Sequence, residues 1–137
     1  MRGARRATVL VVDDDESMRE LLNVHLKSAG YEVQLAEDAI VAGYLIVERP
    51  PDLILVDVDM PYMNGIEFVA ALRADSTLPR IPVVFLTALE DAAELASRKF
   101  GVEALTKPIA VDRLLEAVAR HLPPKEPTPR RPSAALQ

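Results

Sequence analysis

The centre of the chain reads Leu-Ile-Leu-Val-Asp-Val-Asp over residues 53–59. Four consecutive aliphatic residues without polar alternation are typical of a β-strand that is buried on both faces. The aspartates that follow, Asp57 and Asp59, place carboxylates where such a strand ends. This stretch therefore predicts a central parallel strand with acidic groups at its carboxyl end.

Similar apolar runs recur on both sides of this stretch, at residues 8–12, 33–36, 83–86 and 104–106. Segments of helical pattern lie between the runs. One amphipathic stripe is formed by Val111, Leu114, Leu115, Val118 and Leu122, which follow the spacing of one helix face. Repeated β-then-α units imply a parallel sheet with helices on both faces. We therefore expect a single open α/β sandwich.

Length and composition exclude several classes of protein. A chain of 137 residues that is 50% hydrophobic has room for one domain with a sizeable core. The absence of cysteine excludes disulfides, thiolate metal sites and a cysteine nucleophile. No apolar stretch approaches the roughly 20 residues of a membrane span, and the start lacks the long apolar region of a signal peptide. We expect a cytoplasmic protein that does not contact the membrane.

The charge of the chain is unevenly distributed. Residues 7–122 carry 10 Lys/Arg and 20 Asp/Glu, a net charge of −10, so this domain should not bind nucleic acid directly. Residues 1–6 form a basic N-terminal extension with three arginines. Residues 123–137 hold five of the eleven prolines, which predicts a flexible tail or a linker to a missing C-terminal output domain.

Polar side chains follow four of the five predicted strands. They are Asp13, Asp14 and Asp15, then Asp57 and Asp59, then Thr87, and finally Lys107. Because the carboxyl ends of parallel strands share one edge of the sheet, these groups should converge. Crowded carboxylates favour a bound cation, and oxygen-only ligands suit Mg²⁺ or Mn²⁺. With a lysine beside it, Asp57 is the best candidate for a nucleophile that forms an acyl phosphate.

Four segments together resemble the CheY-like receiver domain of two-component response regulators, over residues 7–122 or about 85% of the chain. They are Val-Leu-Val-Val-Asp-Asp-Asp at 9–15, Leu-Ile-Leu-Val-Asp-Val-Asp-Met-Pro-Tyr-Met-Asn-Gly at 53–65, Phe-Leu-Thr-Ala at 85–88 and Leu-Thr-Lys-Pro at 105–108. The resemblance implies a flavodoxin-like (βα)5 doubly wound sandwich, with a parallel five-stranded sheet of order 2-1-3-4-5. It also implies a phosphoacceptor rather than a turnover enzyme, one that assists its own phosphorylation and dephosphorylation.

The resemblance implies a role for each matching residue. Asp57 would accept a phosphoryl group from the phosphohistidine of a histidine kinase or a histidine phosphotransfer protein. Asp14, Asp57 and the backbone carbonyl of Asp59 would ligate Mg²⁺, with Asp13 assisting through water. Lys107 would pair with Asp57 and then with the phosphoryl group.

The remaining matches concern the response to phosphorylation. Thr87 would move toward the phosphoryl oxygen, and the backbone N–H of Ala88 would donate to the phosphoryl group. The Lys107–Pro108 bond is a candidate cis peptide. The resemblance further implies an output protein as a partner, and the mixed charges after Thr87 permit a phosphorylation-dependent homodimer.

Three positions depart from the family pattern. Thr87 and Lys107 lie 20 positions apart, about two fewer than is common in the family, which predicts a trimmed fourth helix or loop. Ala104 occupies the position where an aromatic switch residue often lies. Asp59 adds a carboxylate beside the acceptor, so we expect unusual rates of phosphoryl transfer or hydrolysis.

Two alternative functions follow from the same residues. Ala104 suits a receiver-like interaction module that signals without phosphorylation. The Asp57-Val58-Asp59 motif also resembles the nucleophile motif of haloacid-dehalogenase-like phosphatases. Those enzymes place their metal-binding acidic pair downstream of the nucleophile, whereas Asp13 and Asp14 lie upstream of it here.

Overall fold

A computed structural model describes residues 6–122 of the chain. The predicted tail at 123–137, and all of the predicted basic extension except Arg6, lie outside the described residues. Strands and helices alternate in the order β1 (Thr8–Val12), α1 (Glu16–Ser28), β2 (Glu32–Ala36), α2 (Ala39–Glu48), β3 (Leu53–Asp57), α3 (Gly65–Ala74), β4 (Val83–Thr87), α4 (Glu90–Phe100), β5 (Ala104–Thr106) and α5 (Val111–His121).

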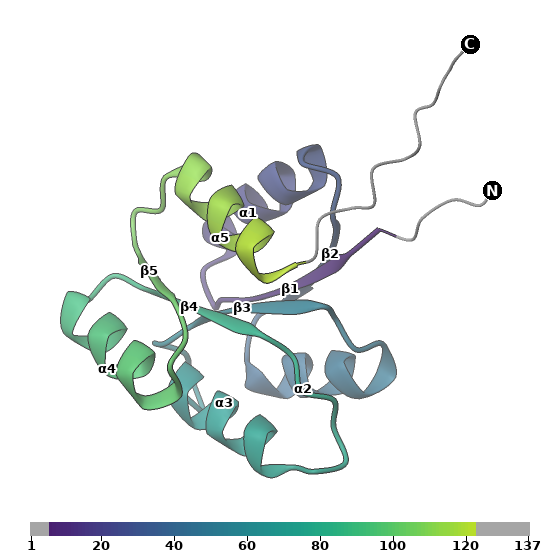
Figure 1. The fold of residues 1–137 in the computed structure, drawn as a ribbon, viewed down its shortest axis with the longest axis vertical. Helices are drawn as coiled ribbons and strands as arrows, with labels where there is room; N and C mark the ends of the chain where they lie inside the picture. Colours follow the sequence, from purple (N-terminus) through teal and green to yellow (C-terminus); the bar gives the residue numbers. More distant parts are fainter. Residues whose placement is uncertain (1–5, 123–137) are drawn as a thin grey trace.

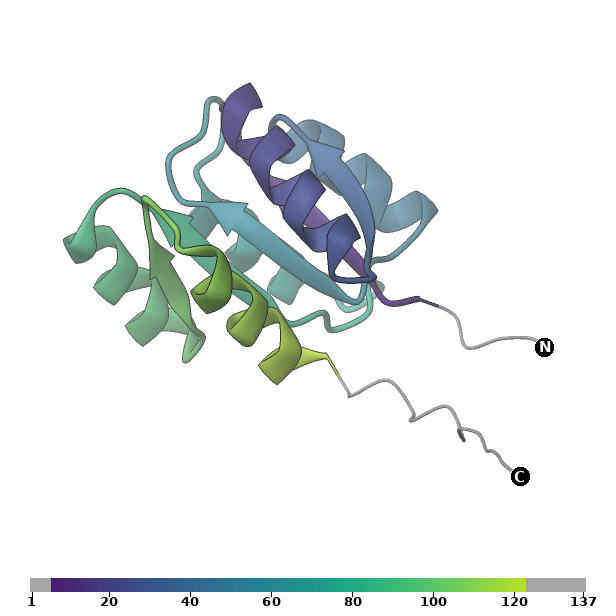
Figure 2. The same ribbon diagram turned by 90° about the horizontal axis from the view of Figure 1, so that it is seen from above.

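The strands form one parallel sheet in the order β2-β1-β3-β4-β5. Helices α1 and α5 cover one face of this sheet, and α2, α3 and α4 cover the other (Figure 1). Figure 2 shows the same layers from above, with α1 and α5 on the near side of the strands. The predicted flavodoxin-like sandwich is therefore confirmed.

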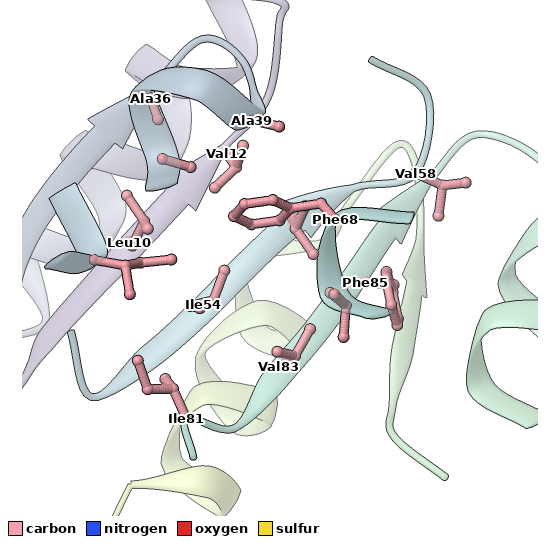
Figure 3. Packing of buried hydrophobic residues seen from close by; sticks show 14 of the residues in the cluster. Leu10, Val12, Ala36, Ala39, Ile54, Val58, Phe68, Ile81, Val83 and Phe85 are labelled. Carbon is pink, nitrogen blue, oxygen red and sulfur yellow. The ribbon is translucent and has the colours of Figure 1, made fainter. Parts of the chain in front are cut away.

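The two faces of the sheet explain why the strands lack polar alternation. In β1, Leu10 and Val12 pack with α2 and α3, whereas Val9 and Val11 pack with α1 and α5. Strands β3 and β4 alternate in the same way, and all their residues are buried. Figure 3 shows Phe68 of α3 among the buried residues on the side of the sheet that α2 and α3 cover. Burial of both faces stabilises the central strands and fixes where they end.

Helix starts hold the loops at the carboxyl edge of the sheet. The Asp15 side chain accepts a hydrogen bond from the Ser17 N–H at 3.0 Å and caps α1. Asn64 and Glu67 form a capping box at the start of α3. These caps fix the loops that follow β1 and β3.

No helix within residues 6–122 combines the length and apolarity that crossing a bilayer requires.

Candidate functional site

The predicted site residues converge because four parallel strands end in register. Val12 lies beside Val56, Asp57 beside Leu86, and Thr87 beside Thr106. Asp13 and Lys107, which directly follow β1 and β5, thus reach the same edge as Asp57. The convergence predicted from the strand pattern is observed.

Three carboxylates form a cluster at this edge. One oxygen each from Asp13, Asp14 and Asp57 lies within 4.8 Å of the others. Asp13 is fully buried and Asp57 is 4% exposed, whereas Asp14 faces solvent. An oxygen-only set that opens to solvent on one side fits a hard cation such as Mg²⁺, which retains several waters.

Lys107 bridges two members of this cluster. Its ammonium Nζ lies 2.8 Å from Asp13 Oδ2 and 3.4 Å from Asp57 Oδ2. Burial lowers the pKa of Lys107, but the hydrogen bond and charge of Asp13, together with the charge of Asp57, raise it overall. The lysine therefore stays protonated. Its closer partner is Asp13, whereas the family resemblance implies a pairing with Asp57.

Asp57 is held in an environment that disfavours its charge. Burial and the neighbouring charge of Asp13 raise the pKa of Asp57 to about 6, against the opposing effects of Lys107 and the Asp59 N–H. That N–H donates to Asp57 Oδ1 at 3.3 Å. Without a cation, the Asp57 carboxyl is thus only partly ionised near pH 6, and an added positive charge would favour its ionised form.

An arginine that the sequence analysis missed, Arg19, is hydrogen-bonded to the backbone of Asp13. Arg19 of α1 donates from Nη1 to the backbone carbonyl of Asp13 at 2.7 Å, and the Asp15 N–H donates to Asp13 Oδ1 at 2.9 Å. The sequence places Arg19 on the solvent side of its helix, yet the side chain is half-buried. Its position six residues after Asp13 was the available signal, since a long side chain one turn into the helix can reach back.

The other predicted site residues differ in their burial and hydrogen bonding. Thr87 is fully buried, and its Oγ1 accepts a hydrogen bond from the Leu89 N–H at 3.1 Å. Ala88 and Asp59 are exposed. The Lys107–Pro108 peptide bond is cis. Thr87 therefore lies at the correct edge but is hydrogen-bonded toward the start of α4.

Gly65 lets α3 begin directly against the end of β3, which carries Asp57. Its N–H donates to the Val58 carbonyl at 2.8 Å. A Cβ at this position would lie 2.3 Å from the backbone oxygen of Asp57. Only glycine fits here, so this position fixes the backbone that carries Asp57.

An open hollow borders Ala104 on the edge strand β5. It has a volume of about 430 Å³ and is lined by Ala104 and Thr106 of β5 and by Glu90, Asp91, Ala93, Glu94 and Ser97. Ala104 is only half-buried. The small side chain leaves this acidic hollow open between α4 and β5.

The sequence matches the family described as the response regulator receiver domain over residues 9–119. Among curated relatives, the phosphate regulon transcriptional regulatory protein PhoB of Pseudomonas aeruginosa is 38% identical over 122 residues, covering 85% of this chain and 53% of PhoB. The DNA-binding dual master transcriptional regulator RpaA of Synechocystis is 36% identical, covering 80% of this chain and 46% of RpaA. The chain thus spans about half the length of these relatives.

Solved structures of other proteins are similar to this chain over almost their whole length. The chemotaxis response regulator CheY4 of Vibrio cholerae is 35% identical with a TM-score of 0.78, covering 86% of this chain and 100% of CheY4. A putative response regulator from Chloroflexus aurantiacus is 31% identical with a TM-score of 0.79, covering 85% of this chain and 97% of the other. Both the fold and the sequence are therefore similar to those of receivers.

Proposed function

The chain belongs to the receiver-domain family of two-component response regulators, and from this premise we propose that Asp57 is its phosphoacceptor. The observation that carries this proposal is the position of Asp57. It is a buried carboxyl at the end of the central strand, within reach of Asp13, Asp14 and Lys107. In the proposed reaction, a carboxylate oxygen of Asp57 attacks the phosphorus of a phosphohistidine. The P–N bond breaks, and the leaving imidazole takes up a proton.

Each neighbouring residue supports one part of this step. Asp13, Asp14 and Asp57, with the Asp59 carbonyl, would hold Mg²⁺. When bound, Mg²⁺ supplies positive charge that offsets the phosphoryl oxygens. Lys107 already lies 3.4 Å from Asp57 and would pair with the transferred group. We assign assistance of its own phosphorylation and dephosphorylation to these residues, although receiver domains are typically not enzymes.

The signal would leave the site through Thr87 and Ala88. The Thr87 hydroxyl would donate to a phosphoryl oxygen, and the Ala88 N–H would donate to another. Both residues directly precede α4, which packs on β4 and β5. Phosphorylation would thus alter the surface of α4 and β5.

The proposed partners are those that such chemistry requires. A histidine kinase or a histidine phosphotransfer protein supplies the phosphoryl group. The reader of the phosphorylated surface is an output protein, a C-terminal output domain or a second copy of this chain. Because the chain spans about half of relatives named as transcriptional regulators, the output of the whole protein is part of this proposal.

Intact-protein mass spectrometry after incubation with acetyl phosphate and Mg²⁺ tests the acceptor. We expect the mass of one added phosphoryl group on the wild type and none on Asp57→Asn. Asp52→Asn is the matched control, because Asp52 lies at the opposite end of β3, where its Oδ2 accepts the Thr8 N–H at 2.7 Å. This control should be phosphorylated like the wild type.

Two outcomes would contradict the proposal. An adduct that survives in Asp57→Asn would move the acceptor elsewhere. No adduct on the wild type, even after rapid quenching, would favour the interaction module that works without phosphorylation. Continuous release of phosphate from a small ester, with no stoichiometric adduct, would instead favour the phosphatase alternative.

A further inference from the structure

A second cavity lies at the edge of the sheet opposite Asp57. It has a volume of about 130 Å³ and is bounded by the end of α2, the end of α3 and the connection from α3 to β4. Figure 3 shows Ile81 and Val83, two of its lining residues, at the far end of β4 from the functional site. None of its lining residues belongs to the acceptor site.

The floor of this cavity is apolar. Aliphatic side chains line it from α2, α3, the α3–β4 connection and the start of β4, namely Ile46, Leu72, Leu78, Ile81 and Val83. Ile46, Ile81 and Val83 are buried in the core. Such a surface favours a hydrocarbon group, and an engineered apolar cavity of about 150 Å³ holds a benzene ring.

Two arginines and one aspartate also line the cavity. Within residues 6–122, neither Arg73 nor Arg80 makes an ion pair or a side-chain hydrogen bond. The Asp75 carboxylate is engaged by Thr77, whose N–H and hydroxyl donate to Oδ1 at 2.9 and 2.6 Å. Burial lowers the pKa of Arg73, and the charge of Arg80 lowers it further. The two guanidiniums thus repel each other, and Asp75 is the one anionic residue of the lining.

A helix-end role accounts for Arg73 and not for Arg80, which is exposed. Arg73 lies in the last turn of α3, where the helix dipole favours a cation. Arg80 belongs to no helix, yet it lines the same cavity. Two guanidiniums beside an aliphatic floor suit a planar carboxylate on an apolar body, because arginine binds carboxylates with paired hydrogen bonds.

We propose that this cavity binds a small carboxylate with an aromatic or branched aliphatic body, with the carboxylate at Arg73 and Arg80 and the body on the aliphatic floor. The site is separate from Asp57, so occupation does not require phosphorylation. The ligand carries a single negative charge, because Asp75 leaves a net charge of +1 among the three charged residues of the lining.

An NMR titration of the ¹⁵N-labelled full chain with benzoate tests this site. We expect amide shifts over residues 72–83 and near Ile46, and none at Asp57. Benzamide, which has the same ring without the charge, should bind at least about tenfold more weakly. Acetate and inorganic phosphate, which lack the ring, should also bind more weakly. Arg80→Gln should weaken benzoate binding several-fold, and Asp57→Asn should leave it unchanged.

The matched control is Arg98→Gln, which removes an exposed arginine of α4 that is not part of the cavity lining. It should bind benzoate like the wild type. Equal binding of benzamide would overturn the role of the arginines, and equal binding of phosphate would overturn the role of the floor. Shifts scattered over the surface, or no binding, would overturn the site itself. Because Arg73→Gln also removes a helix-end charge, Arg80→Gln is the deciding variant.

Discussion

Asp57 is a buried carboxyl whose charged form is disfavoured until a cation binds. Its pKa of about 6 in the folded chain exceeds the ordinary value of 3.8. Between these values the unfolded chain releases the proton and the folded chain keeps it, so stability falls as pH rises. Above pH 6 Asp57 is ionised in both states, and its burial then lowers the free energy of unfolding by about 3 kcal/mol. Without Mg²⁺ at pH 7.5, Asp57→Asn should therefore raise the free energy of unfolding by up to about 3 kcal/mol.

Urea denaturation at several pH values measures this difference. The gain in Asp57→Asn should shrink below pH 6 and vanish below about pH 4, where both states are protonated in the wild type. Saturating Mg²⁺ should stabilise the wild type more than the variant. A gain that is the same at pH 4 and pH 7.5 would show that burial of charge is not its cause.

Asp59 adds a second negative charge two residues after Asp57, the proposed acceptor. Its side chain is exposed, so solvent screens its effect on an incoming phosphoryl donor. We expect Asp59→Asn to speed phosphorylation by acetyl phosphate about two- to fivefold, because the asparagine removes the repulsion and keeps the size. Stopped-flow kinetics measure the rate. An unchanged rate of both phosphorylation and dephosphorylation would refute a tuning role for Asp59.

At the scale of single elements, Gly65 allows α3 to lie directly against the strand that carries Asp57. An added Cβ would meet the Asp57 backbone oxygen at 2.3 Å, and backbone cannot yield as a side chain can. Gly65→Ala should destabilise the chain by about 1–3 kcal/mol and slow phosphorylation. Gly43→Ala is the control within α2, where nothing lies within 4 Å of the added Cβ. It should be neutral or stabilise by up to about 1 kcal/mol. Thermal unfolding of both variants gives the comparison, and equal effects would contradict the proposed clash.

Arg19 connects helix α1 to the acidic cluster. Its guanidinium holds the Asp13 carbonyl at 2.7 Å, so its loss should free the loop that carries Asp13 and Asp14. We expect Arg19→Gln to weaken Mg²⁺ binding several-fold with little change in fold, since one hydrogen bond contributes about 1 kcal/mol. Isothermal titration calorimetry measures the affinity, with Arg98→Gln as an exposed arginine control. An unaltered affinity would leave Arg19 with a purely structural role.

Sequence reasoning succeeded where periodicity decides position. Asp57 and Lys107 follow buried strands, and parallel strands must bring such residues to one edge. Arg19 could not be found in this way, because a helical period places its Cα near solvent but does not say where a long side chain reaches. The cavity at Arg73 and Arg80 also escaped prediction, since the path of the α3–β4 connection brings the two arginines together.

At the scale of the whole molecule, any coupling between Asp57 and the surface of α4 and β5 must work without an aromatic side chain at position 104. Ala104 has no ring to move, and the hollow beside it is open already. The remaining connection runs through Thr87, whose hydroxyl accepts the Leu89 N–H at 3.1 Å. Leu89 is the N-cap of α4 and offers no side-chain hydrogen bond to that helix. The start of α4 therefore has no side-chain cap, and the Thr87 hydroxyl holds the N–H of its N-cap residue.

Phosphorylation should loosen this helix start. If the Thr87 hydroxyl turns toward the phosphoryl group, the Leu89 N–H loses its acceptor, and amide exchange at residues 89–93 should rise severalfold. Hydrogen exchange with and without beryllofluoride, a phosphoryl mimic, measures the effect. Thr87→Ala should show fast exchange at residues 89–93 in both states, because the variant lacks the hydroxyl that accepts the Leu89 N–H. Thr106→Ala, an exposed threonine on the neighbouring strand, should respond like the wild type. A response that persists in Thr87→Ala would mean that the signal travels by another route, such as Lys107 and β5.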